Sequence, residues 1–203
     1  MAIIVRPASF ELGGEIMTDS AEPDPLSWMG AEFRDRVATQ SYEEQPGIDG
    51  VALFDLQLLG DEGGDFCEVG RYNAHGELEA APGFRPAQCG YSFMEPGTIK
   101  AWHLHVRQED LWFIPPHDRC LVGLLDVREK STTYQCRMRF VMGGGRARLL
   151  LIPRGVAHGI ANLSNRPASM FYFVNEAFNR DNPDEQRLPW DLLGEDFWRN
   201  VPG

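Results

Sequence analysis

Residues 97–114 read GTIKAWHLHVRQEDLWFI, and this stretch carries most of the information about fold and function. It contains His103 and His105 together with acidic residues and two tryptophans. Because successive side chains of a β-strand point to opposite faces, His103 and His105 are expected to line one wall together. A second segment, residues 152–162 (IPRGVAHGIAN), supplies His158. The functional prediction depends mostly on whether these two segments face each other.

Strand-like segments separated by Gly- and Pro-containing turns follow one another from residue 47 onward. We expect strands over residues 51–59, 66–72, 88–94, 98–105, 110–114, 120–127, 133–141, 147–152 and 170–174. Many short strands with at most one helix predict an all-β sandwich or barrel closed from antiparallel sheets. We expect one such domain over residues 47–203. Residues 1–46 form an N-terminal extension of unknown role, with a short helix predicted over 27–42.

Composition and charge exclude several classes of protein. The net charge of -11 argues against nucleic acid or an anionic membrane as the main partner, although a local basic cluster could still bind an anionic small ligand. Apolar runs fall short of the length that a membrane span needs. The four cysteines show no C-x-x-C spacing and are expected to be reduced core residues of a cytoplasmic protein.

Two histidine-containing motifs resemble the two-part signature of the cupin superfamily. The first is G-x5-H-x-H-x3-E, starting at Gly97, and the second is P-x-G-x2-H-x3-N, ending at Asn162. The resemblance implies a small jelly-roll barrel with three His and one Glu at its mouth. One hypothesis is therefore a metal-dependent dioxygenase or isomerase that binds one divalent ion such as Fe, Mn, Ni or Zn. Its ligands would be His103, His105, Glu109 and His158.

Over residues 48–198 the sequence also resembles one cupin branch, the dTDP-4-dehydrorhamnose 3,5-epimerase family. The resemblance rests on six features in the family's order: GDEGGDFCE at 60–68, the pair Gln88 and Ser92, GTIKAWH at 97–103, DVR at 126–128, IPRGVAHG at 152–159 and PDEQRLPWDLLGEDFW at 183–198. It implies the same jelly-roll barrel and a nucleotide-sugar isomerase.

The chemistry implied by this family explains the histidines without a metal or other cofactor. A keto group at C4 of a sugar acidifies the neighbouring C–H bonds, and neutral His103 could remove such a proton as a general base. The resulting enolate needs a donor or cation at its oxygen, for which Lys100 and His158 are the candidates. Phe178 stands where the family carries the tyrosine that returns the proton to the opposite face. The reaction could therefore be epimerisation at one carbon or a keto-isomerisation.

The resemblance also implies a nucleotide-linked sugar of the dTDP type as ligand and a homodimer as the assembly. The residues expected to bind the substrate are Phe66, Glu68, Gln88, Ser92, His105, Asp110, Arg128 and Tyr172. Asp110 could instead orient His103 or cap a turn. A sugar-nucleotide binder without turnover is a third hypothesis, because Phe178 cannot donate a proton.

Overall fold

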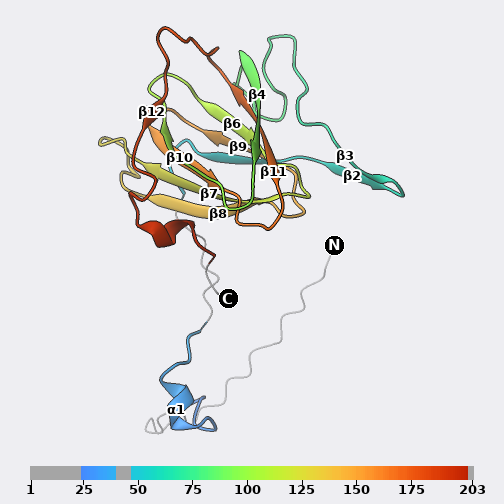
Figure 1. Cartoon of the computed structure of the whole chain (residues 1–203). Coiled ribbons are helices and arrows are strands. Elements are labelled where there is room, and N and C mark those ends of the chain that lie inside the picture. Colours follow the sequence, from blue (N-terminus) through green and yellow to red (C-terminus); the bar gives the residue numbers. More distant parts are fainter. Residues whose placement is uncertain (1–23, 40–46, 201–203) are drawn as a thin grey trace, which may run out of the picture. The chain divides into compact units, whose positions relative to one another are not determined.

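The computed structural model of the chain describes residues 24–39 and 47–200, which fall in two units divided between Glu43 and Glu44 (Figure 1). The described part of the first unit contains one short helix, α1 (Ala31–Arg34). The prediction of a helix over 27–42 was too long. Trp28, Phe33 and Val37 are all exposed, and no side chain caps the helix at Gly30. Residues 40–42 of that prediction lie outside the described residues.

The second unit is a barrel of two five-stranded antiparallel sheets, which confirms the predicted jelly roll (Figure 1). The first sheet has the order β1 (Ala52–Asp55), β9 (Arg148–Ile152), β6 (Asp110–Phe113), β11 (Ala168–Val174), β4 (Gln88–Met94). The second has the order β12 (Gln186–Arg187), β5 (Ile99–Leu104), β10 (Val156–Ala161), β7 (Arg119–Asp126), β8 (Arg137–Gly143). A separate hairpin pairs β2 (Leu58–Asp61) with β3 (Gly64–Cys67).

The core lies between the two sheets. Met94, Trp112 and Leu150 from the first sheet pack in one cluster with Val122 and Ile160 from the second. These side chains alternate with outward-facing ones along each strand, as expected for sheets with one face in the core. The inner faces of the sheets therefore form the main hydrophobic core, and the space between them that side chains leave open is available for a ligand.

Further hydrophobic clusters cover the outer faces of both sheets. Trp102 on β5 is fully buried against Trp198 of the short 3-10 helix η1 (Glu195–Trp198). Gly159 on β10 permits this close approach, because a Cβ there would lie 2.9 Å from the Trp198 ring and 2.5 Å from Ala101 Cβ. Trp102 and Leu104 thus face away from the wall that His103 and His105 line, as strand alternation predicted.

Several predicted elements differ in detail. The strand expected over 51–59 is split into β1 and β2, and β10 and β12 had not been predicted as strands. The four cysteines are free, but Cys120 alone among them is fully buried, where burial raises its thiol pKa to about 12. Cys89 is exposed, so the expectation that all four are core residues was wrong.

Candidate active site

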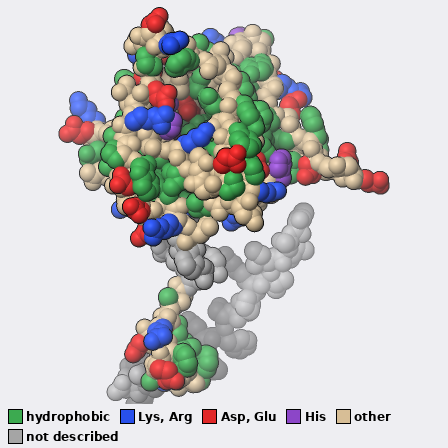
Figure 2. Space-filling view, in the orientation of Figure 1, with side chains coloured by type: hydrophobic (Ala, Val, Ile, Leu, Met, Phe, Trp, Pro, Cys, Tyr) green, Lys and Arg blue, Asp and Glu red, His purple; other side chains and the backbone are tan. Residues whose placement is uncertain are grey.

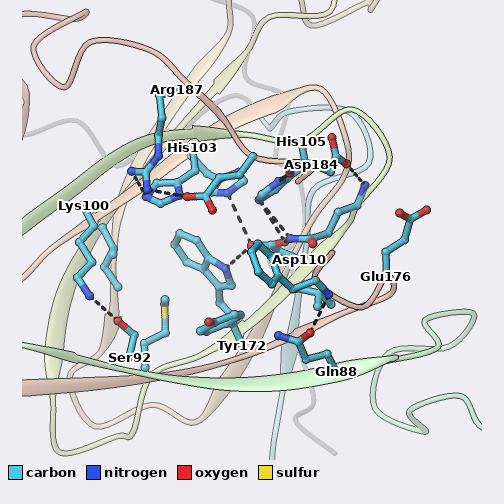
Figure 3. Close-up of a pocket in the computed structure, with 18 of the residues that line it drawn as sticks. Gln88, Ser92, Lys100, His103, His105, Asp110, Tyr172, Glu176, Asp184 and Arg187 are labelled. Atoms are coloured by element: carbon cyan, nitrogen blue, oxygen red, sulfur yellow. Dashed lines mark hydrogen bonds and ion pairs between the residues drawn. The ribbon is translucent and has the colours of Figure 1, made fainter. Parts of the chain in front are cut away.

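A cavity of about 900 Å³ opens between the two sheets (Figure 3). One wall comes from β5 and β10 of the second sheet, and the facing wall comes from β4, β6 and β11 of the first. Several residues of the segment 176–187, together with Arg107 and Gln108, line the rest of the cavity. The two histidine segments of the sequence do come together. They pair side by side as β5 and β10 of one sheet, with His103 and His158 as direct neighbours in the register. Their rings stack with centroids 6.0 Å apart.

His103 is contacted at both ring nitrogens by the C-terminal segment. Arg187 Nη1 lies 2.8 Å from His103 Nε2, and Glu185 Oε1 lies 3.3 Å from Nδ1. A guanidinium can only donate and a carboxylate can only accept, so Nδ1 carries the proton and Nε2 presents its lone pair. Burial, followed by the positive charge of Arg187, lowers the pKa of His103 to about 4. The ring is therefore neutral at neutral pH, with Nε2 as its basic atom.

His105, Asp110 and His158 form a buried cluster beside His103. His105 Nε2 lies 3.7 Å from Asp110 Oδ1, and His158 Nε2 lies 3.6 Å from Asp110 Oδ2. Gln108 Nε2 donates to Asp110 Oδ1 at 2.7 Å, and Trp112 Nε1 donates to Asp110 Oδ2 at 2.9 Å. Burial lowers the pKa of His158, so this ring too is neutral.

Backbone carbonyls fix the orientation of both rings in this cluster. His158 Nδ1 lies 2.9 Å from the Val156 carbonyl oxygen, and His105 Nδ1 contacts the carbonyl oxygen of Asp184. Because a carbonyl only accepts, each Nδ1 carries a proton, and the neutral ring of His158 has its lone pair on Nε2. In this form His158 Nε2 is an acceptor and cannot donate to an oxyanion.

The remaining predicted residues of the cavity lie around the histidines (Figure 3). Lys100 Nζ donates to Ser92 Oγ at 2.6 Å across the gap between the two sheets. Gln88 Oε1 accepts from the backbone N–H of Phe178 at 2.9 Å. Tyr172 lines the wall opposite His103, and its ring lies directly over Gly90, where a Cβ would be 2.3 Å from Tyr172 Cζ.

Residues 184–187 hold the C-terminal segment against the cavity mouth. The Asp184 carboxylate accepts hydrogen bonds from the backbone N–H groups of residues 106, 107 and 108, at 3.0, 2.7 and 2.8 Å. Burial acts to raise the pKa of Asp184, but these three hydrogen bonds outweigh it and hold the pKa below its ordinary value. β12 then pairs with β5, with Arg187 opposite His103.

Sequence reasoning missed several site residues, of which Glu185 and Arg187 matter most because they contact His103. Arg107, Gln108 and Asp184 were missed as well. Glu185 and Arg187 fall inside the 183–198 motif, but nothing in the motif shows that it returns to the histidine strand. Pairing of β12 with β5 makes that link, and β12 is only two residues long. The one available signal was the charged run D-E-Q-R in a chain segment rich in loop-forming residues.

Glu109 does not join the histidines, so the four-residue metal set His103, His105, Glu109 and His158 is not brought together. Its backbone N–H and carboxylate contact Asn175 at 2.8 and 3.3 Å, and its side chain does not line the cavity. Asp110 begins β6, and alternation sends Asp110 and Trp112 inward while Leu111 and Phe113 pack in the outer cluster. Glu109 therefore falls in the same alternating set as Leu111 and Phe113, which point away from the cavity.

Three residues expected to bind substrate lie away from this cavity. Phe66 is 62% exposed on β3, and Glu68 pairs with Arg71 at 2.8 Å just beyond that strand. Arg128 makes a two-pronged contact with the buried Asp126 carboxylate, at 2.8 Å for each hydrogen bond. A buried carboxylate needs such a partner, so Arg128 has a structural role here rather than a place in the cavity.

The fold and the comparisons with known proteins agree on one class, the jelly-roll epimerases and isomerases of nucleotide-linked keto-deoxysugars. Residues 45–192 match the family model described as dTDP-4-dehydrorhamnose 3,5-epimerase, and the chain belongs to this family. It is therefore an enzyme of the epimerase and isomerase class. No helix among the described residues is long and apolar enough to span a membrane.

Three similar proteins support this assignment. The spore coat polysaccharide biosynthesis protein SpsL of Bacillus subtilis is 41% identical over 144 residues, which is 71% of this chain and 91% of that protein. A dTDP sugar isomerase from Desulfovibrio desulfuricans G20 aligns with a TM-score of 0.63 and 26% identity, over 76% of this chain and 91% of that one. A dTDP-4-dehydrorhamnose 3,5-epimerase from Bacillus anthracis, with TDP and PPi bound, aligns with a TM-score of 0.58 and 25% identity, over 70% and 80%.

Proposed function

We propose that this enzyme epimerises or isomerises a nucleotide-linked 4-keto deoxysugar, or a related keto sugar, with His103 as the base. The observation that carries the proposal is the state of His103 in the cavity. Its Nδ1 proton faces Glu185, and its neutral ring has its lone pair on Nε2, where Arg187 donates a hydrogen bond that a substrate proton would replace. A neutral imidazole held in one tautomer suits the removal of a proton next to a carbonyl group.

Lys100 is the residue best placed to stabilise the enolate oxygen. Its ammonium group lines the cavity from β5, three residues before His103 on the same strand. Ser92 Oγ and the Phe93 carbonyl oxygen, at 2.6 and 3.3 Å, hold it there. The neutral form of His158 presents an acceptor at Nε2, so among the two candidates Lys100 takes the oxyanion role.

Tyr172 is the proposed acid that returns the proton. Phe178 also lines the cavity, but its ring has no group that can donate. Tyr172 stands on β11 of the first sheet, whereas His103 stands on β5 of the second, so a sugar between the sheets would meet them on opposite faces. Inversion at a carbon needs the proton to leave from one face and arrive at the other.

The proposed substrate carries a nucleoside diphosphate, of the dTDP type. TDP is bound in the related Bacillus anthracis enzyme. Lys100, Arg107 and Arg187 line the cavity of this otherwise acidic chain and provide local positive charge for a diphosphate. Arg107 is half exposed and paired with Glu176 at 3.4 Å, so it could exchange this partner for a phosphate at little cost.

We also propose that the enzyme is a homodimer. Tyr91 and Phe93 on β4 and Phe171 on β11 are 38–55% exposed on the outer face of the first sheet. Figure 2 shows hydrophobic side chains at the surface over these two strands. β4 is also an edge strand of its sheet, and edge strands of this kind are often covered by a second copy.

Proton exchange tests the proposed function directly. The protein is incubated in D2O with dTDP-4-keto-6-deoxyglucose, and NMR follows deuterium incorporation at C3 and C5. We expect incorporation at one or both carbons, and a loss of about 100-fold or more in its rate for His103→Gln. Glu109→Gln, a change outside the cavity, is the matched control and should keep the wild-type rate.

Two results would contradict the proposal. Exchange by His103→Gln at the wild-type rate would remove His103 as the base. A wild-type protein whose melting temperature rises with dTDP, but which exchanges no sugar proton, would be a binder of this class of ligand rather than the proposed epimerase.

A further inference from the structure

Arg187 occupies the one atom of His103 that can accept a proton (Figure 3). Arg187 Nη1 donates to His103 Nε2 at 2.8 Å, and the proton on Nδ1 leaves the only ring lone pair of the neutral imidazole on Nε2. A guanidinium keeps its protons in proteins, so Arg187 cannot act as the base itself. One lone pair does not serve two donors. His103 therefore takes a sugar proton only after Arg187 has moved.

Glu185 is engaged by the same arginine. Arg187 Nη2 donates to Glu185 Oε1 at 2.6 Å, and this oxygen also lies 3.3 Å from His103 Nδ1. Departure of Arg187 thus frees the lone pair on Nε2 and leaves Glu185 Oε1 to His103 alone. Both changes favour a protonated imidazole, because Arg187 is the second cause, after burial, of the lowered His103 pKa, whereas Glu185 acts to raise that pKa.

The contacts that hold the Arg187 side chain are weak enough to be exchanged. Its side chain is 56% exposed, and that of its partner Glu185 is 39% exposed. Ion pairs with this degree of exposure contribute little free energy. Pairing of β12 with β5 keeps the Arg187 backbone opposite His103, so the side chain alone has to turn.

A diphosphate has the chemistry that draws Arg187 away from His103. A guanidinium binds phosphate oxygens in a bidentate manner, and this contact is stronger than one with a neutral imidazole because both partners are ionised. A diphosphate also carries more negative charge than the Glu185 carboxylate. Arg187 lines the same cavity as Lys100 and Arg107, so an anionic group bound there meets several positive charges together. A free sugar offers hydroxyl and keto oxygens, which compete poorly with a carboxylate for Arg187.

We propose that Arg187 makes the base selective for substrates that carry a diphosphate. Without this group Arg187 stays on His103 Nε2. When the diphosphate binds, Arg187 turns to a phosphate oxygen and His103 becomes free to take the sugar proton. The inference rests on the proposed function and gives a reason for a nucleotide-linked sugar, rather than the free sugar, as substrate. Arg187 is a positioning residue, since it acts on the chemistry through His103.

Two substrates separate this role from a structural one. Deuterium exchange in D2O is followed by NMR for dTDP-4-keto-6-deoxyglucose and for 4-keto-6-deoxyglucose, which lacks the diphosphate. Arg187→Ala should lower kcat/KM for the nucleotide-linked sugar by about fivefold or more, because a phosphate contact is lost. The same change should raise kcat/KM for the free sugar by about threefold or more, because Nε2 is no longer covered. A variant that merely disturbed the fold would lower both.

Arg180 provides the matched control. It carries the same charge in the same segment, but it is exposed and does not line the cavity. Arg180→Ala should keep the wild-type kcat/KM with both sugars. Arg187→Leu retains the aliphatic stem and should show the same opposite changes, so it serves as a second variant should Arg187→Ala not fold. A fall, or no change, in kcat/KM for the free sugar in the folded variants would overturn the inference.

Nitrogen NMR observes the contact without turnover. In protein that contains isotopically labelled histidine, with the His103 signals assigned through His103→Gln, saturating dTDP should move the Nε2 signal downfield as its lone pair loses a donor. Arg187→Ala should show that position without dTDP. An Nε2 signal that dTDP leaves unchanged would overturn the inference, while sugar exchange by the wild type would keep the proposed function intact. A dTDP-dependent shift without any sugar exchange would contradict the proposed function, and the selectivity with it, although Arg187 does change its partner.

Discussion

At the scale of single residues, the reactivity assigned to His103 depends on two side chains from a distant segment. The sequence could predict His103 and His158 as neighbours of one cavity because spacing along strands determines which face a side chain occupies. It could not predict Glu185 and Arg187, because their contact with His103 requires residues 82 and 84 positions later to return to the same strand. Local patterns carry no information about such pairings.

Replacing Glu185 should slow the chemistry without weakening substrate binding. Glu185→Gln keeps an oxygen near His103 Nδ1 but removes the charge that favours a protonated imidazole in the transition state. We expect kcat to fall by about tenfold or more, with KM unchanged, in the epimerisation assay. Glu176→Gln, which removes a carboxylate at the other side of the cavity, should leave kcat within about threefold. Equal kcat for Glu185→Gln and wild type would show that Glu185 does not act through His103.

Replacing Tyr172 should separate proton removal from inversion. In Tyr172→Phe, His103 still exchanges the sugar proton with solvent, but the opposite face lacks an acid. We therefore expect deuterium incorporation to continue while formation of the epimer falls by about 100-fold. NMR of one reaction mixture in D2O reports both rates. Phe178→Leu is the control and should retain both, whereas full epimerisation by Tyr172→Phe would exclude Tyr172 as the acid.

At the scale of elements, a shift of one residue decided which carboxylate enters the cavity. The motif resemblance placed Glu109 among the histidines, but β6 starts at Asp110 and turns Asp110 and Trp112 inward. Since a strand alternates with a period of two, an error of one position moves a side chain to the opposite face. Motif spacing predicted the barrel and the strand that carries the site. It did not predict which side chains of β6 point into the cavity.

The carboxylate that ends β7 should control stability in acid. Burial acts to raise the pKa of Asp126, but hydrogen bonds from Arg128, Ser131 and Thr133 outweigh burial and hold the pKa well below the ordinary value of 3.8. A lowered pKa stabilises the folded state above the unfolded pKa, and this contribution is lost as the pH falls below it. Asp126→Asn should lower the free energy of unfolding at pH 7 by about 3 kcal/mol.

Urea unfolding between pH 7 and pH 3 checks this prediction. The difference between wild type and Asp126→Asn should be constant down to about pH 4 and shrink below it. Asp55→Asn, at the exposed end of β1, should track the wild type at every pH. A difference that grew as the pH fell would contradict the assigned direction of the pKa shift.

At the scale of the whole molecule, the barrel leaves hydrophobic side chains exposed on a hairpin and along the β4–β11 edge of the first sheet. Phe66 and Leu59 on the β2–β3 hairpin are 62% and 49% exposed, and aromatic side chains project from β4 and β11. Exposed aromatic groups in this number are typical of a surface that contacts another protein. The family resemblance predicted a homodimer, and these surfaces support it, but a sequence alone does not reveal which strands remain uncovered.

A charge on the exposed sheet face should separate the subunits. Light scattering of the wild type should give about twice the chain mass of 22.9 kDa. Phe171→Glu places a carboxylate on the outer face of β11 and should shift the protein to the monomer mass at micromolar concentration, with the barrel still folded. Trp28→Glu, on the N-terminal unit, is the control and should stay dimeric. A monomeric wild type would contradict the proposed assembly.

The attachment of residues 184–187 to the barrel should determine the temperature at which the enzyme loses activity. They supply the carboxylate that binds the 106–108 turn, the carbonyl that orients His105 and both partners of His103. Apart from the two-residue strand β12, they belong to no larger element of the barrel. Segments of this kind open at lower free energy than core strands. Catalysis should therefore disappear on warming while the barrel itself still gives the circular dichroism of a folded protein.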